Sequence, residues 1–235
     1  MMQVLNKYRF GSYVYGTWQP GSDEDFICIT DKPGAEAEPD TQYYTREVFQ
    51  RLLDHHEIAA LECYFLPDRF ILRQSYAGFT FNLDKGRLRV SISTMSANSW
   101  VKGKKKLTVP GDYDERQGIK SVFHAIRILE LGIQLAQTAR INDYSACNWL
   151  YEALCKLAAA GPDRLWERID DRYRKLYHKL QTQFRELCPK TGIPQHRLKL
   201  ELIGLFREND CYTTEVVQRK LVDKIIQLVH NTHDL

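Results

Sequence analysis

The sequence predicts an α+β protein, in which a short mixed β-sheet flanked by helices is followed by an all-helical C-terminal part. The first half alternates short β-prone runs, such as DFICI at residues 25–29, with helical runs. From about residue 115, apolar residues recur at spacings of three and four, and strand-like alternation ends. The turn-rich segment TVPGDYDERQ separates the two patterns, so we expect one domain over residues 1–114 and another over residues 115–235.

The composition is that of an ordinary globular protein, with 43% hydrophobic and 27% charged residues in a chain of 235. The N-terminus lacks the apolar core of a signal peptide, and no run approaches the roughly 18 to 20 apolar residues that a membrane span requires. We therefore expect a cytoplasmic protein with no membrane partner. The six cysteines are scattered and lack the spacing of a zinc site, which favours small buried thiols.

Charge is strongly segregated along the chain. Residues 21–62 contain eleven acids and three Lys or Arg, whereas residues 84–106 contain seven Lys or Arg and one acid. Such segregation suggests a site that binds cations and a separate surface that binds anions. The alternative is that both segments are solvated faces without a ligand.

The first half contains several expected elements. We predict strands over residues 7–11 and 25–29, a loop over 33–42 and a helix over 45–56, for which Thr45 is the N-cap. The apolar run IAALECYFL, residues 58–66, predicts a third strand. The segment FTFNLDKGRLRVSIS, residues 79–93, predicts a hairpin in which residues 84–86, from Asp84 to Gly86, form the turn and apolar residues alternate with polar ones after it.

The second half contains four expected helices. Their apolar residues recur at helical spacing over residues 116–137, 144–161, 162–189 and 213–231. Gly161 and Pro162 provide a stop between the second and third of them.

A glycine and a serine follow the first expected strand. Gly11 has no Cβ, so a phosphate is able to approach the backbone there, and the Ser12 hydroxyl is a suitable donor to it. This pair is common in proteins and is weak evidence by itself.

Three consecutive acids, Asp23, Glu24 and Asp25, precede the second strand. Residues two apart on an extended segment project from one face, so Asp23 and Asp25 are placed to share a divalent cation, while Glu24 points the other way. Without a cation or a basic partner, two such carboxylates repel each other. Glu62 is the candidate third acid because it is the one ionisable residue between Ile58 and Leu66; the alternative is a solvent-facing position on an edge strand.

The pattern G-S-x(10)-D-x-D resembles the nucleotidyltransferase superfamily that includes DNA polymerase beta. The stretch GSYVYGTWQPGSDEDF, in which Ser22 precedes the acids, is similar to predicted nucleotidyltransferases associated with RNA ligases and RNA repair. The resemblance implies that Asp23, Asp25 and Glu62 bind two Mg²⁺ ions, with Mn²⁺ as an alternative, and that Glu62 also accepts the proton of the attacking hydroxyl. It also implies that Gly11, Ser12 and Ser22 contact the phosphates of a nucleoside triphosphate.

Two basic groups are candidates for substrate binding. Lys120, His124 and Arg127 share one stripe of an expected helix, and with the family resemblance we expect them to bind the triphosphate or the acceptor. The segment WVKGKKKL combines a stackable ring with positive charge, which suits nucleic acid; its residues are Trp100, Lys102, Lys104, Lys105 and Lys106. The alternative in both cases is a plain solvated surface.

The favoured interpretation is a template-independent, metal-dependent nucleotidyltransferase of the EC 2.7.7 type. It would transfer a nucleoside monophosphate from an NTP to an acceptor hydroxyl, most simply an RNA or DNA end. Two alternatives stay open at this point: a binding module that keeps the fold without catalysis, and an enzyme that nucleotidylates a protein hydroxyl, as toxin-type relatives do.

Overall fold

The computed structural model describes residues 2–34 and 38–191. The described residues form two compact units, which we treat separately. The sheet unit contains the chain up to Val14 together with Gln19–Asn82. The helical unit contains Tyr15–Trp18 and Leu83–Lys190.

The sheet unit is built on a four-stranded mixed sheet in the order β3-β2-β1-β4. Its strands are β1 (Val4–Phe10), β2 (Asp25–Thr30), β3 (Thr41–Thr45) and β4 (Ile71–Gln74). β1 runs antiparallel to both β2 and β4, and β2 runs parallel to β3. The predictions of strands at residues 7–11 and 25–29 are confirmed, whereas β3 and β4 had no distinct signal because each is short and lies at an edge.

The register of β1 and β2 places the first residue of β2 beside the last residue of β1. Phe10 lies opposite Asp25, and Tyr8 lies opposite Ile27. Since side chains alternate between the two faces of a strand, Asp25, Ile27 and Ile29 share one face. The two isoleucines are 1% and 0% exposed, so the carboxylate of Asp25 sits at the end of the buried face of the sheet.

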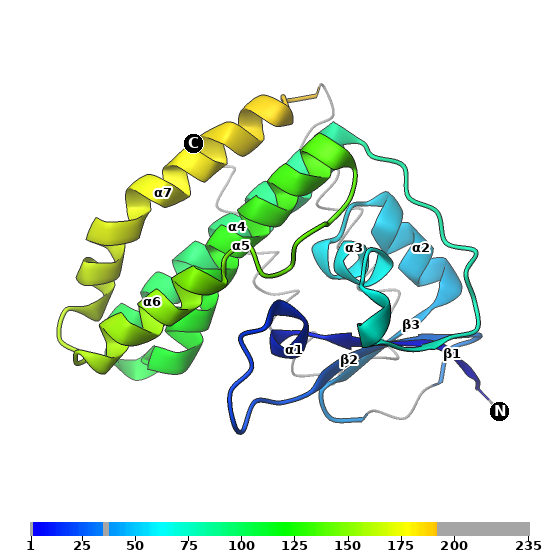
Figure 1. Ribbon diagram of the computed structural model, residues 1–235, viewed down its shortest axis with the longest axis horizontal. Coiled ribbons are helices and arrows are strands. Elements are labelled where there is room, and N and C mark those ends of the chain that lie inside the picture. The colour runs from blue at the N-terminus through cyan, green and yellow to red at the C-terminus, as the bar shows by residue number, and fades with distance from the viewer. Residues whose placement is uncertain (1, 35–37, 192–235) are drawn as a thin grey trace. The chain divides into compact units, whose positions relative to one another are not determined.

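That face is covered by α2 (Arg46–Asp54) and α3 (Ile58–Tyr64), as Figure 1 shows. The predicted N-cap of α2 is confirmed, because the Thr45 hydroxyl accepts a hydrogen bond of 3.3 Å from the Val48 N–H. The rings of Tyr8 and Phe49 stack across the interface with a centroid separation of 6.2 Å. The buried side chains of α2 form an apolar stripe that packs on the sheet and holds the helix there; they are Val48, Phe49, Leu52 and Leu53.

The prediction of a third strand over residues 58–66 is wrong, because this segment forms α3. The Glu57 carboxylate caps the helix by accepting a hydrogen bond of 2.9 Å from the Ala60 N–H. A short run that is apolar on every side has no period that distinguishes a strand from a buried helix. Two adjacent alanines and the cap decide in favour of the helix.

The predicted hairpin over residues 79–93 is also wrong, because most of it belongs to α4 (Lys85–Thr108). Asp84, which we expected in a turn, is the N-cap and accepts hydrogen bonds from the N–H groups of Gly86 (2.8 Å) and Arg87 (3.0 Å). Leu88 and Ile92 are fully buried, and their spacing of four fits one face of a helix as well as one face of a strand.

The helical unit continues with three more helices where helices were predicted. These are α5 (Glu115–Thr138), α6 (Asn148–Ala159) and α7 (Leu165–Leu187). Figure 1 shows α4 and α5 side by side, and their close approach depends on glycine. A Cβ at Gly103 would lie 2.7 Å from Cγ2 of Val122, and one at Gly118 would lie 2.5 Å from Cγ of Leu107. The fourth predicted helix, over residues 213–231, lies outside the described residues.

The α+β fold class is confirmed: a four-stranded mixed sheet with helices is followed by a mostly helical region. The expected boundary at residue 114 falls between the 3₁₀ turn η2 (Pro110–Asp112) and α5, inside the helical unit. The remaining short elements are α1 (Ser12–Tyr15) and η1 (Asp68–Phe70). Among the described helices, none combines the length and apolarity needed to cross a bilayer.

Candidate active site at the end of the sheet

The glycine turn after β1 and the acid that opens β2 are in direct contact. Gly11 has a φ of +76°, in the left-handed region that favours glycine. A Cβ built on Gly11 would lie 2.3 Å from Oδ2 of Asp25, so any side chain at this position collides with the carboxylate. The structure therefore brings together the two ends of the G-S-x(10)-D-x-D pattern, which are fourteen residues apart in the chain.

The two aspartates differ in their surroundings. Asp25 is half-buried at the start of β2, whereas Asp23 precedes the strand and is exposed. Carboxylate oxygens are hard ligands that suit Mg²⁺, which is commonly bound through one or two protein carboxylates and completed by substrate phosphates and water. The pair fits such an ion.

Glu24, between the two aspartates, has a different role. Its Oε2 atom lies 3.1 Å from Nη2 of Arg9, which is the penultimate residue of β1. The Arg9 guanidinium also lies over the ring of Tyr13, with 5.3 Å between Cζ and the ring centroid. This ion pair connects β1 to the acidic segment on the face opposite Asp25. Arg9 was not among the predicted site residues, although its position two residues before the glycine was a usable signal.

The two serines of the motif lie in different environments. Ser12 opens the single turn of α1 directly after Gly11 and is half-buried. Ser22 closes the turn that precedes the acids, because its hydroxyl accepts a hydrogen bond of 3.1 Å from the Gln19 N–H while its own N–H donates to the Gln19 carbonyl at 2.9 Å. Ser22 therefore shapes the loop that carries Asp23.

The structure does not bring Glu62 to the aspartates. Glu62 lies on α3 and is 1% exposed, within the helical layer that covers the sheet. Among the described residues, no three His, Cys, Asp or Glu side chains form a group that could hold a metal ion. The expectation of a third strand-borne carboxylate fails because residue 62 is on a helix.

Glu62 belongs instead to a buried acidic pair with Glu57. Burial raises the pKa of Glu57 to about 7, and the charge of Glu62 adds to this effect, while the hydrogen bond from the Ala60 N–H opposes it. Burial also raises the pKa of the neighbouring Cys63 thiol, with both glutamates contributing. Glu62 lies in the hydrophobic interior and Glu57 is half-buried beside it, so the pair is unsuited to binding a hydrated cation.

The expected basic stripe on α5 is only partly accessible. Arg127 is 4% exposed and lies flat against Tyr15, with 3.5 Å between Cζ and the ring centroid. Its Nε atom donates to Nδ1 of His124 at 3.4 Å. Burial lowers the pKa of His124 to about 3, and the charges of Arg127, Lys120 and Lys102 contribute. His124 is therefore a neutral acceptor at physiological pH, and Lys120 is half-buried.

The expected nucleic-acid segment lies on the last turns of α4. The Trp100 ring stacks on Tyr177, with centroids 4.3 Å apart and an interplanar angle of 9°, and also meets the edge of Trp166 at 5.6 Å. Lys105 and Lys106 both pair with Asp112, at 3.1 Å and 2.7 Å, and lower its pKa. Trp100 therefore packs between helices, whereas Lys104 is exposed and Lys102 is half-buried.

The glycine turn and the D-x-D pair at the end of the sheet have the residue types expected of a site that holds a metal ion against phosphate groups. Residues 3–93 match the family described as nucleotidyltransferase domain. This match covers the first strand, the glycine turn, the acids and the beginning of α4. It supports the predicted superfamily, and nucleotidyl transfer as the general activity. Neither the search of curated proteins nor the search of solved structures found a match.

Proposed function

We propose that this protein transfers a nucleoside monophosphate from an NTP to an acceptor hydroxyl on a nucleic-acid end, without a template and with a divalent metal ion. The observation that carries the proposal is the contact between Gly11 and Asp25, because it holds the glycine turn directly beside a carboxylate whose chemistry suits a metal ion. The wider motif supports the RNA-repair branch of the superfamily and RNA as the acceptor.

In this mechanism Asp23 and Asp25 would hold the metal ion, for which Mg²⁺ is the best fit to carboxylate ligands. When bound, the ion neutralises charge on the triphosphate and on the leaving group. The Ser12 hydroxyl and the backbone N–H groups of the turn bind the terminal phosphates. The acceptor hydroxyl releases its proton to water, its oxygen forms a bond to the α-phosphorus, the bond from that phosphorus to the bridging oxygen breaks, and pyrophosphate leaves.

The Arg9–Glu24 pair positions the metal-binding segment. Asp23 and Asp25 flank Glu24, so holding its carboxylate on the opposite face keeps both aspartates directed to one side. The pair is partly exposed, at 30% and 43% for the two side chains, and its role is orientation more than stability.

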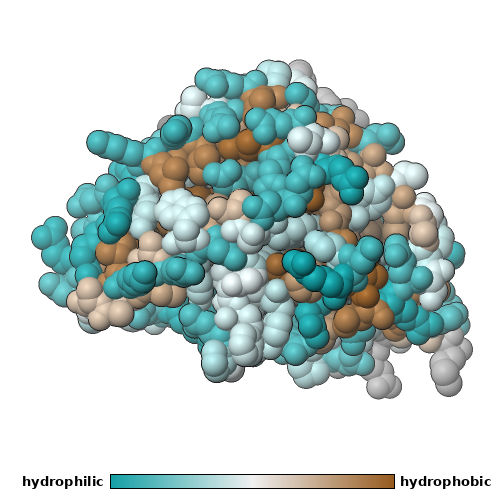
Figure 2. Space-filling model, in the orientation of Figure 1, coloured by the Kyte–Doolittle hydropathy of each residue, from teal (hydrophilic) through white to brown (hydrophobic). Residues whose placement is uncertain are grey.

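The helical unit offers stacking residues that differ from the one first expected. Trp18 and Trp149 are 46% and 53% exposed, so their indole rings are able to stack on unpaired bases. Figure 2 shows apolar areas interspersed with hydrophilic ones on the visible face. Lys102, Lys104 and Lys120 supply positive charge for the phosphate backbone. We therefore assign stacking to Trp18 and Trp149 in place of Trp100.

The test is transfer of label from each α-labelled NTP to RNA, DNA and protein acceptors in the presence of Mg²⁺. We expect transfer to RNA, and a loss of at least about 100-fold in the Asp23→Asn and Asp25→Asn variants. The matched comparison is Glu24→Gln, which removes the same charge from the same segment but leaves both proposed metal ligands, so we expect only the loss of about ten-fold that follows from its pair with Arg9. Transfer that is unchanged in both aspartate variants would refute the proposal. Label found on the protein acceptor alone would show that the acceptor is a protein hydroxyl and not a nucleic-acid end.

A further inference from the structure

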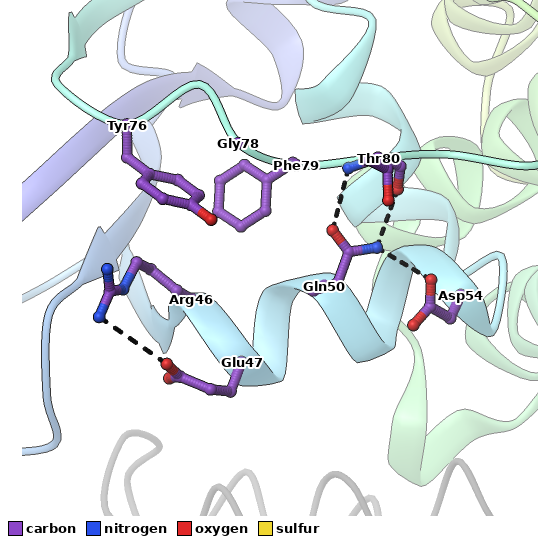
Figure 3. Close-up of a pocket in the computed structure, with 8 residues that line it drawn as sticks. All are labelled: Arg46, Glu47, Gln50, Asp54, Tyr76, Gly78, Phe79 and Thr80. Atoms are coloured by element: carbon purple, nitrogen blue, oxygen red, sulfur yellow. Dashed lines mark hydrogen bonds and ion pairs between the residues drawn. The ribbon is translucent and has the colours of Figure 1, made fainter.

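A hollow lies in the sheet unit, between α2 and the segment that follows β4. It has a volume of about 510 Å³, within the range of roughly 300–1,000 Å³ that is usual for ligand sites. Figure 3 shows two aromatic rings on one side and a polar stripe of α2 on the other. The lining residues are Arg46, Glu47, Gln50 and Asp54 from the helix, and Tyr76, Gly78, Phe79 and Thr80 from the segment after β4.

This hollow lies at the opposite end of the sheet from the aspartates. Arg46 begins α2 directly after Thr45, which pairs with Thr30 at the end of β2, whereas Asp25 is at its start. Five residues of extended chain separate the two ends of β2, a distance of about 17 Å. A ligand in the hollow therefore does not share the proposed metal ligands.

The walls are held by hydrogen bonds to the main chain. The Gln50 amide accepts from the Thr80 N–H at 3.0 Å and donates to the Thr80 carbonyl at 2.8 Å, as Figure 3 shows. The buried Asn6 side chain binds the other end of the same segment, accepting from the Ser75 and Tyr76 N–H groups at 3.1 Å and 3.0 Å. Two amide side chains thus fix both ends, so the hollow is preformed.

Arg46 provides the positive end of the hollow. Its guanidinium lies over Tyr76, with 5.4 Å between Cζ and the ring centroid. Nε is buried and has no hydrogen-bond partner within the part of the chain that the structure describes. The contact of Nη2 with Glu47 is loose, at 3.9 Å between side chains that are 42% and 66% exposed. The guanidinium therefore keeps donors for an oxyanion, which it binds in a planar fork.

The middle of the hollow is aromatic, and the end far from Arg46 is acidic. The rings of Tyr76 and Phe79 meet edge to face at 4.8 Å and form an aromatic wall. Asp54, eight residues after Arg46 and about 12 Å along the helix, presents a carboxylate that accepts hydrogen bonds. Gln50 already donates to Oδ1 of Asp54 at 2.9 Å, so Oδ2 is the acceptor that a ligand N–H would use.

We propose that this hollow is a second nucleotide site, which binds a nucleoside monophosphate without a metal ion. The phosphate pairs with Arg46, the base lies against Tyr76 and Phe79, and an N–H donor of the base reaches Asp54. Gly78 allows the Tyr76 ring to take this position, because a Cβ at residue 78 would lie 2.6 Å from the Tyr76 hydroxyl and would displace the ring. The proposal goes beyond nucleotidyl transfer and does not depend on it.

The experiment is calorimetric titration of the full chain with AMP in the presence of EDTA, with adenosine and inorganic phosphate as separate probes. We expect one AMP per chain, and about ten-fold weaker binding of each fragment because each lacks one end of the ligand. Arg46→Gln should weaken AMP binding about ten-fold or more, and Gly78→Ala should weaken it by displacing Tyr76. Arg51→Gln, which removes the same charge from the same helix outside the lining, should leave the affinity unchanged within about two-fold.

A further variant separates this proposal from the proposed function. The double variant Asp23→Asn, Asp25→Asn should keep metal-independent AMP binding even though transfer is lost. The proposal is overturned by absence of AMP binding in EDTA, by equal affinity in Arg46→Gln and the parent protein, or by loss of binding in the double aspartate variant. A protein that transfers no label but binds AMP through Arg46 would refute the proposed function alone.

Discussion

Replacement of Gly11 by alanine tests the geometry at the end of the sheet. The φ of +76° makes any side chain unfavourable there, at a cost of about 1–2 kcal/mol in the free energy of unfolding. The new Cβ would also lie 2.3 Å from Oδ2 of Asp25, and a separation of 3.0 Å requires the carboxylate to retreat by about 0.7 Å. That displacement exceeds the tolerance of about 0.2 Å in metal–ligand distances.

Gly21 is the matched control for this substitution. Its φ is +80°, but a Cβ there meets no atom within 4 Å. Gly21→Ala should therefore show the backbone cost alone, whereas Gly11→Ala should also weaken Mn²⁺ binding and reduce transfer about 100-fold. Urea denaturation, titration with Mn²⁺ followed by electron paramagnetic resonance, and the transfer assay measure the three quantities. Equal Mn²⁺ affinity and equal transfer in the two alanine variants would show that the contact with Asp25 does not matter.

Three further predictions concern other parts of the chain. Arg9→Gln should lower transfer about ten-fold with a change of less than about 1 kcal/mol in stability, because Glu24 is then no longer held; an equal loss in the Glu24→Gln variant would support the pair, and normal transfer in both would contradict it. Glu57 has a folded-state pKa of about 7 against an ordinary value of 4.5, so its contribution to stability is complete below about pH 4.5 and is lost as the pH rises through 7. The loss is at most about 3 kcal/mol, and Glu57→Gln should flatten this part of a stability curve measured by urea denaturation; an unchanged slope would contradict the assignment. Trp100→Ala should lower the free energy of unfolding by about 2–3 kcal/mol, because the stack on Tyr177 is lost. Trp149→Ala should change the free energy of unfolding by less than about 0.5 kcal/mol and should weaken binding of single-stranded RNA. If Trp100→Ala weakens RNA binding and Trp149→Ala does not, Trp100 is the stacking residue as first predicted.

The helices of the second half were predictable because their signals are local. The spacing of apolar residues in α5 extends over more than six turns, and such a length leaves no alternative to an amphipathic helix. The cap of α2 at Thr45 was predictable for the same reason, since a cap depends on residues within one turn. Segments of seven to nine residues carried less information, and α3 was mistaken for a strand.

The hairpin over residues 79–93 shows how an ambiguous period misleads. Leu88, Val90 and Ile92 alternate with polar residues, which is the pattern of a strand, but Leu88 and Ile92 are also one helical turn apart. Packing against α5 decides between them, because glycines at positions 103 and 118 allow the two helices to approach closely. That contact joins residues far apart in the chain, so no local pattern contains it.

The sequence by itself determined the glycine turn and the paired aspartates, since their chemistry depends on residue types and short spacings that hold in any extended segment. Tertiary structure alone decided the positions of the other candidates: Glu62 is within a covering helix, Trp100 is stacked on Tyr177, and Arg127 lies against Tyr15. The physical reason is that the availability of a charge or a ring for a ligand depends on burial. Burial is set by which distant elements pack together.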